Sequence, residues 1–173
     1  GVKGFRFIIR ALGRLPADRR PPLVLAGDRE CPGEAEYLHA LAREHGVELT
    51  THLNVTDETL RSLYRRTRLF LYAPYIEPLG LTPLEAMACG TPVLGVREGG
   101  VRETVIEGVN GRLADRDEGQ YATVLQEMLA APEKLQRLGE QGMAGVRERW
   151  TWERSVQELL GFFDEARRLA AGG

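Results

Sequence analysis

Short apolar segments alternate with stretches of helical periodicity along the chain, and this alternation limits the fold more than any other feature of the sequence. Four apolar segments, at residues 23–28, 47–53, 69–74 and 92–96, have the length and composition of strands. The segment "LFLYAP" (69–74) is apolar throughout its first half, as expected for a parallel strand covered on both faces. Strands that alternate with helices predict βαβ units, and therefore an α/β fold with a doubly wound parallel sheet.

The intervening stretches carry the apolar stripes of amphipathic helices. The first stripe has the i, i+3, i+4, i+7 spacing and consists of Phe5, Ile8, Ile9 and Leu12. Further helices are predicted around residues 38–42 and 60–64, and from residues 117, 132 and about 151. Thr56 or Asp57 is expected to cap the helix around 60–64. Between the last strand and residue 117, polar Gly-Gly and Asn-Gly segments predict turns around one short element.

The composition of the chain argues against several classes of protein. The formal net charge is −2, from 23 basic and 25 acidic residues, which leaves no basic excess for binding nucleic acid. No apolar run approaches the roughly 20 residues of a membrane-spanning helix. Cys31 and Cys89 are far apart and the three histidines form no ligand pattern, so we expect neither a disulfide framework nor a metal site. This cysteine usage favours a reducing, cytoplasmic location.

The segment "YIEPLGLTPLEAMACG" (75–90) follows the predicted strand at 69–74 and contains two glutamates eight positions apart. In a doubly wound sheet, ligands bind beyond the carboxyl ends of the strands, which is where this segment begins. One interpretation of the segment is structural. Thr82 would be the N-cap of a helix, Pro83 its first residue and Glu85 its third, which makes a T-x-x-E capping box.

A second interpretation of the same segment is a ligand site. A glycine before a helix lets the backbone approach a ligand closely, and the free N–H groups of Gly80, Leu81 and Thr82 would attract a phosphate. Glu77 and Glu85 would repel a phosphate and are suited instead to accept hydrogen bonds from hydroxyl groups. Carboxylates on both sides of an anion site fit a nucleoside-diphosphate sugar, in which a diphosphate lies between two hydroxyl-rich groups.

The segment also resembles a known signature. "EPLGLTPLE" is similar to the E-x7-E motif of retaining glycosyltransferases of family four, in the C-terminal nucleotide-sugar-binding domain of their GT-B fold. The similarity to that domain covers nearly the whole chain in the family's order. It includes the segments "VKGFRFIIRAL", "NVTDETLRSLY", "EAMACGTPVLGVREGGVRETV" and "WTWERSVQELL".

The resemblance implies a single Rossmann-like donor-binding domain over residues 1–173, with 151–170 as its closing helix. It also implies an N-terminal acceptor domain and a first strand that this sequence does not include. The reaction would transfer a glycosyl group from a nucleoside-diphosphate sugar to an acceptor held by the N-terminal domain, with retention of anomeric configuration. The nucleotide sugar is a substrate, so neither a cofactor nor a bound metal is implied.

The family's site roles carry over residue by residue. Glu77 and Lys3 would take part in catalysis, because Glu77 would bind the hydroxyl groups of the donor sugar and Lys3 would balance the charge of the diphosphate. Glu85 would bind the ribose, and Val55 would contact the base through its backbone. The diphosphate would be held by the amides of Gly80, Leu81 and Thr82.

Structural explanations stay open for several of these residues. Lys3 could be an ordinary solvated lysine, and Val55 could belong to the core. Gly99 and Gly100 are interpreted as a turn after a strand. A solvated helix face is predicted for Arg61, Arg65, Arg66 and Arg68, and a role in anchoring the last helix for Trp150 and Trp152.

Other functions also stay open. One is a different GT-B enzyme, such as a nucleotide-sugar epimerase or a phosphorylase, although neither Lys3 nor Lys134 is placed to hold the pyridoxal phosphate of a phosphorylase. Another is a nucleotide-sugar-binding module without turnover, and a third is a doubly wound domain with some other ligand. The sequence carries no signal for the nucleotide base, for the acceptor or for membrane association.

Overall fold

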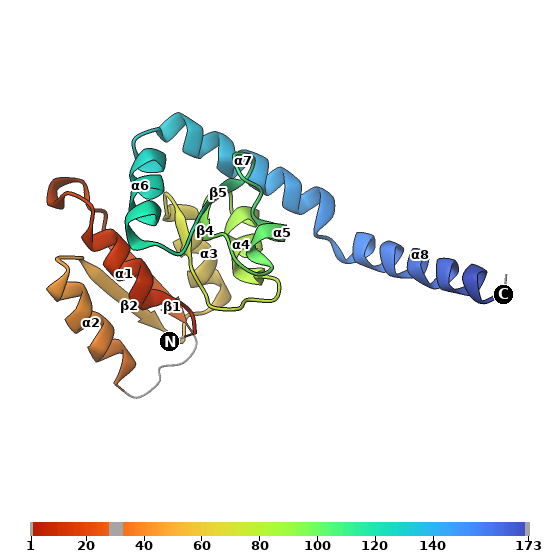
Figure 1. Ribbon diagram of the computed structural model, residues 1–173, viewed down its shortest axis with the longest axis horizontal. Coiled ribbons are helices and arrows are strands. Elements are labelled where there is room, and N and C mark those ends of the chain that lie inside the picture. The colour runs from red at the N-terminus through yellow and green to blue at the C-terminus, as the bar shows by residue number, and fades with distance from the viewer. Residues whose placement is uncertain (1, 28–32, 172–173) are drawn as a thin grey trace.

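Parallel strands form the centre of the molecule in a computed structural model that describes residues 2–27 and 33–171 (Figure 1). The strands are β1 (Leu23–Gly27), β2 (Leu49–Leu53), β3 (Phe70–Tyr72), β4 (Val93–Val96) and β5 (Gly111–Ala114). Hydrogen bonds join them in two groups, with the orders β1-β2 and β3-β4-β5, and every pair is parallel. This arrangement confirms the predicted α/β class with parallel strands.

The four predicted strands are present with shorter bounds, and a fifth was not predicted. The segment predicted at 69–74 contributes only Phe70–Tyr72 to β3, and Asp28, the predicted end of the first strand, lies outside the described residues. β5 begins at the glycine of an Asn-Gly pair and contains Arg112, so no apolar run marks it in the sequence. It forms because β4 offers a pairing edge, with Val93 opposite Gly111 and Val96 opposite Ala114.

Helices follow each strand, as the sequence predicts. Their bounds are α1 (Phe5–Gly13), α2 (Glu34–Glu44), α3 (Asp57–Arg66), α4 (Leu81–Ala88), α5 (Val101–Thr104), α6 (Glu118–Leu129), α7 (Pro132–Arg149) and α8 (Trp152–Ala171), with a 3-10 turn at Ala17–Arg19. Thr56 caps α3, because its Oγ1 accepts a hydrogen bond from the Thr59 amide at 3.2 Å. Pro132 is the first residue of α7, as its missing N–H favours.

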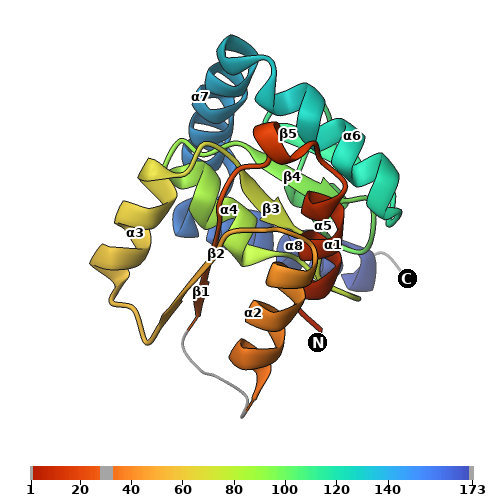
Figure 2. The same ribbon diagram turned by 90° about the vertical axis from the view of Figure 1, so that its left-hand side faces the viewer.

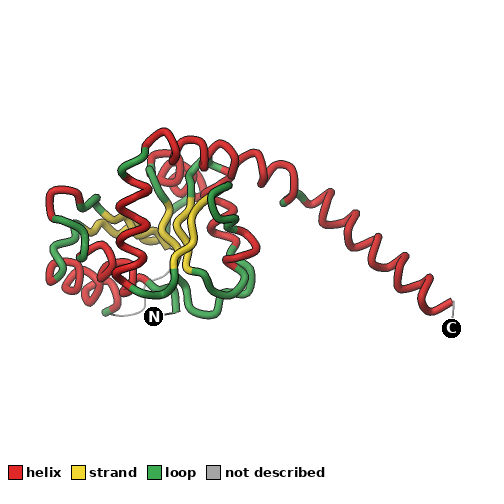
Figure 3. Tube along the Cα trace, turned by 45° about the horizontal axis from the view of Figure 1, so that its top comes forward, coloured by secondary structure: helices red, strands yellow, loops and turns green. Residues whose placement is uncertain are grey.

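Two separate apolar clusters show that helices cover both faces of the strands. One cluster joins α1, α2 and α6 to Leu94 and Val96 of β4. The other joins α3, α4 and α5 to Val93 of the same strand. Figure 2 shows α3 and α4 on one side of the strands and α1 and α6 on the other, and Figure 3 shows the strands enclosed by helices. The alternation of β4 between the two clusters is typical of a doubly wound arrangement.

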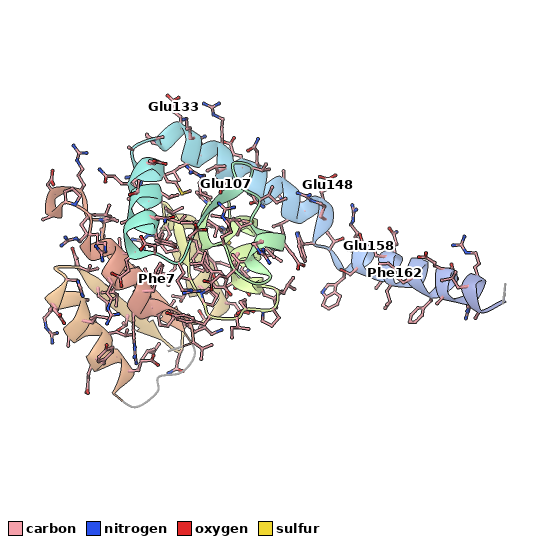
Figure 4. The ribbon with its side chains drawn as sticks, viewed as in Figure 1. Phe7, Glu107, Glu133, Glu148, Glu158 and Phe162 are labelled. Carbon is pink, nitrogen blue, oxygen red and sulfur yellow. The ribbon has the colours of Figure 1, made fainter. Side chains whose placement is uncertain are left out.

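The last helix, α8, extends away from the other elements (Figures 1 and 3). Its residues from Trp152 to Ala170 are all exposed, and none belongs to either apolar cluster. Figure 4 shows Phe162 on this projecting helix. Trp152 is 84% exposed, so the prediction that it anchors the helix is wrong for this structure. None of the described helices is both long enough and apolar enough to cross a membrane.

Candidate functional site

Helix α4 begins at the carboxyl end of β3 with an uncapped N-terminus. Gly80 is its N-cap, is buried and has a φ of 85°, a left-handed conformation that favours glycine. No side chain caps the helix. No acceptor among the described residues takes a hydrogen bond from the backbone N–H groups of Gly80, Leu81 or Thr82. Free amides that converge at the positive end of a helix dipole form a site for an anion.

The predicted capping box is wrong. The helix begins at Leu81, so Thr82 is its second residue and Glu85 its fifth, which is too far into the helix for Glu85 to reach the N-cap amide. The left-handed Gly80 accounts for this difference, because it turns the chain into the helix before Thr82. Thr82 Oγ1 is shielded from solvent and has no hydrogen-bond partner in the part of the chain that the structure describes. Both residues are therefore free of the capping role that competed with a ligand role.

Glu85 instead has a tyrosine as its partner. The Tyr64 hydroxyl, from α3, donates a hydrogen bond to Glu85 Oε2 at 3.2 Å. Tyr64 is only 8% exposed, whereas Glu85 is an exposed residue. Burial, reinforced by the charge of Glu85, raises the pKa of the Tyr64 phenol, which therefore stays a donor at physiological pH. The hydrogen bond orients Glu85 and leaves its remaining acceptor sites open to solvent.

Glu77 is half-buried, and its backbone is held by the segment after β4. The Gly100 amide donates to the Glu77 carbonyl at 2.9 Å. A Cβ atom on Gly100 would lie 1.9 Å from the Pro78 carbonyl oxygen, and one on Gly99 would lie 2.5 Å from that of Glu77. Gly99 and Gly100 form the predicted turn after β4, and in addition they permit a close contact that braces the loop around Glu77.

Two further residues shape the surroundings of Glu77. Ile76 has a φ of 52° and is 92% exposed. A β-branched residue with this φ is a strained exception, of a kind that clusters at functional sites. On the strand before the loop, burial raises the pKa of Tyr72 to about 12, and the nearby Glu77 carboxylate contributes to the rise.

Lys3 lies beside this loop although 70 or more residues separate them in sequence. The Val2 carbonyl accepts a hydrogen bond from the Tyr75 amide at 2.8 Å. Gly4 has a φ of 75°, and a Cβ atom there would lie 1.7 Å from the Ala73 carbonyl oxygen. The start of α1 and the end of β3 are therefore in direct contact, and the exposed Lys3 stands at this junction.

The other predicted site residue, Val55, lies in the connection from β2 to α3 and is half-buried. β2 is parallel to β1, the strand with which it pairs. No hydrogen bond joins Val55 to the loop around Glu77 among the described residues. The basic run is solvent-exposed, as predicted, at Arg61, Arg65, Arg66 and Arg68.

Within residues 2–27 and 33–171, no group of three His, Cys, Asp or Glu side chains could hold a metal ion. Cys89 is a free thiol, and Cys31 lies outside the described residues. A hollow lined in part by Leu84, Met87 and Trp150 contains none of the predicted site residues.

Some residues at this site were missed by sequence reasoning. Tyr64 lies in the segment 60–64, for which the sequence predicts only a helix, and the sequence predicts only a turn for Gly99 and Gly100. Arg116, which contacts the same loop, and its partner Glu98 carry no signal in the sequence, because they lie 18 residues apart and on different connections. Contacts of this kind depend on the tertiary fold.

The chain matches known proteins over most of its length. The family model for glycosyl transferases group 1 matches residues 1–144. A curated relative, D-inositol 3-phosphate glycosyltransferase 2 of Catenulispora acidiphila, is 35% identical over 95% of this chain and 43% of its own length. The chain therefore spans less than half the length of this relative.

Solved structures agree with this match. Sucrose-phosphate synthase from Thermosynechococcus elongatus superposes with a TM-score of 0.82 at 28% identity, over 99% of this chain and 43% of that one. HepE from Anabaena, in complex with UDP-glucose, superposes with a TM-score of 0.79 at 26% identity, over 95% of this chain and 46% of that one. These neighbours are GT-B proteins with Rossmann-like domains, which confirms the predicted fold class. The chain belongs to the glycosyl transferases group 1 family.

Proposed function

We propose that this chain binds a nucleoside-diphosphate sugar at the N-terminus of α4, as the donor half of a retaining glycosyltransferase. The observation that carries the proposal is the uncapped helix start, where the amides of Gly80, Leu81 and Thr82 have no acceptor among the described residues. A diphosphate would complete these hydrogen bonds and would interact favourably with the helix dipole. The structure of HepE with UDP-glucose, at 26% identity, supports a donor of this chemical class.

The flanking carboxylates receive distinct roles in this proposal. Glu85, oriented by Tyr64, would accept hydrogen bonds from the ribose hydroxyl groups. Glu77, in the braced loop before the helix, would accept hydrogen bonds from the donor sugar. Lys3 would contribute positive charge near the diphosphate, and the backbone at Val55 would contact the base.

In the reaction, the glycosyl group would leave the diphosphate and join an acceptor with the same anomeric configuration. The amides at the start of α4 and Lys3 would stabilise the negative charge that develops on the leaving diphosphate. Neither a resident cofactor nor a metal ion is part of the proposal. The acceptor would be bound by a separate part of the protein, as expected for a chain that spans 43% of its relative.

The proposal is tested by two isosteric variants and a control. Glu85→Gln should weaken binding of UDP, or of whichever nucleoside diphosphate binds, by about tenfold, because a charged acceptor makes a stronger hydrogen bond than a neutral one. Glu77→Gln should leave the affinity for the bare nucleotide unchanged and reduce the preference for its sugar conjugate. Glu148→Gln, at an exposed carboxylate on α7 (Figure 4), should change neither affinity.

Isothermal titration calorimetry with UDP, GDP and ADP and their glucose and mannose conjugates measures these affinities. If Glu85→Gln and Glu77→Gln both bound like the parent, the site assignment would be wrong. A nucleotide-sugar-binding module without turnover makes the same binding predictions and differs only in showing no glycosyl transfer, in the complete protein, to any acceptor.

A further inference from the structure

A largely buried arginine contacts the proposed donor loop, which we define as residues 73–80. Arg116 follows β5, and its side chain is 15% exposed. Its Nε donates to both carboxylate oxygens of Glu98 at 2.9 Å, and its Nη2 donates to Glu98 Oε2 at 2.7 Å. Nη1 donates to the Ala73 carbonyl at 3.0 Å, and Nη2 also donates to the Pro74 carbonyl. One guanidinium group therefore joins the segments that follow β3, β4 and β5.

Aromatic contacts hold the same guanidinium in place. Its central carbon lies 3.9 Å from the centre of the Tyr75 ring and 5.5 Å from that of Phe7. Both distances are within the range of a cation–π interaction. Partial burial opposes the charge of Arg116, but the ion pair with Glu98 outweighs this effect and the pKa of Arg116 is raised. The group is therefore charged at physiological pH.

Glu98 connects Arg116 to the middle of the donor loop. It immediately precedes Gly99 and Gly100, whose backbone packs against Glu77 and Pro78. The Gly100 amide donates to the Glu77 carbonyl at 2.9 Å. Arg116 thus holds the beginning of the loop directly, through two carbonyl groups, and holds its middle through Glu98 and the glycine pair.

We propose that Arg116 and Glu98 are positioning residues that fix the donor loop, and with it the Glu77 carboxylate and the free amides at the start of α4. The claim that this loop binds a nucleotide sugar rests on the proposed function, whereas the fixing of the loop does not. Lysine cannot replace Arg116, because its ammonium group lacks the planar fork that contacts a carboxylate and two carbonyl groups together. Glu98→Gln keeps one side-chain oxygen as an acceptor and removes the negative charge.

Hydrogen–deuterium exchange on the 173-residue chain tests this proposal, with Arg116→Lys, Arg116→Gln and Glu98→Gln as variants. Arg20 provides a matched control, because it also donates to several carbonyl groups, at 2.7 to 3.1 Å, but beside Gly13 and Gly46 at the far end of α1. In both Arg116 variants, the hydrogen-bonded amides of Tyr75 and Gly100, which donate to Val2 and Glu77, should exchange about tenfold faster, because the loop loses its hydrogen bonds to a charged group. Glu98→Gln should give a smaller rise, and Arg20→Lys should leave these two amides unchanged.

The outcomes separate this proposal from the proposed function. Unchanged exchange of the Tyr75 and Gly100 amides in the Arg116 variants would overturn the positioning role, as would an equal rise in Arg20→Lys, which would indicate general destabilisation. A selective rise with a matching loss of affinity for UDP-glucose, or for whichever conjugate the parent binds, supports both. If the exchange rises selectively in the variants but the parent chain binds no sugar nucleotide, the positioning role is supported and the donor site is overturned. Glu98→Gln keeps the test decisive if the Arg116 variants do not fold.

Discussion

Replacing Tyr64 with phenylalanine tests whether the hydrogen bond to Glu85 serves the site or the fold. The substitution removes one hydroxyl group, which donates to Glu85 Oε2 at 3.2 Å. Hydrogen bonds to charged groups contribute about 1.5–3 kcal/mol when shielded, but Glu85 is exposed and water can replace the lost donor. We therefore expect the free energy of unfolding to fall by less than about 1 kcal/mol.

The same substitution should affect binding more clearly than stability. Without Tyr64 the Glu85 carboxylate must be ordered when the ribose binds, at a cost of about 0.5–1.5 kcal/mol for an immobilised side chain. This cost corresponds to a nucleoside-diphosphate affinity that is weaker by roughly two- to tenfold. Calorimetric titration measures this affinity, and thermal unfolding measures the stability.

Tyr121→Phe is the matched control, because it deletes the same atom from a purely structural position. The Tyr121 hydroxyl donates to the Leu94 carbonyl at 2.8 Å, and both residues are fully buried. Its loss leaves a buried carbonyl with one partner fewer and should cost about 1–3 kcal/mol of stability without changing the affinity. If Tyr64→Phe bound nucleotide like the parent, or if the two variants lost stability equally, our account of Glu85 would be refuted.

Three further predictions follow from the geometry. Gly100→Ala places a methyl group 1.9 Å from the Pro78 carbonyl oxygen, so the donor loop must shift and the donor affinity measured by calorimetry should fall about tenfold, whereas Gly161→Ala, in open space, should leave this affinity unchanged. The pKa of Tyr72 is raised to about 12, above its ordinary value of 10.0, so its contribution to stability is present below about pH 10 and is lost as the pH rises to about 12. Thermal unfolding between pH 9 and pH 12 should therefore show a smaller alkaline loss of stability in Tyr72→Phe, and an equal loss would contradict the prediction. Trp152 is 84% exposed, so Trp152→Ala should change the free energy of unfolding by about 0.5 kcal/mol or less, and a loss above 2 kcal/mol in chemical denaturation would show that the helix packs on the body.

The alternation of strands and helices could be predicted from the sequence because it follows from the spacing of apolar residues within each segment. The spacing of Phe5, Ile8, Ile9 and Leu12 marks a helix face within one segment, and Thr56 caps its helix with an oxygen three residues from its donor. β5 escaped prediction because its pairing with β4 joins residues 18 apart and its own residues carry no apolar run. Local signals predict local structure, and this strand depends on a distant edge.

The candidate site likewise has features that could be predicted from the sequence and features that could not. Its position after β3 and its residues could be predicted from spacing and from the family resemblance. The capping box could not be rejected from the sequence, because only the left-handed Gly80 moves the helix start to Leu81. The contacts that hold the loop, from Arg116 to Ala73, join residues 43 apart and required the fold.

The central claim is that the free amides at the start of α4 hold the diphosphate of a sugar nucleotide. Proton–nitrogen NMR correlation spectra of the 173-residue chain, titrated with UDP, GDP and ADP and their sugar conjugates, test it most directly. We predict that one base series shifts the amide resonances of Gly80, Leu81 and Thr82 more than any others, in a saturable manner. Saturable shifts that lie elsewhere in the molecule, with these three resonances unmoved, would contradict the account.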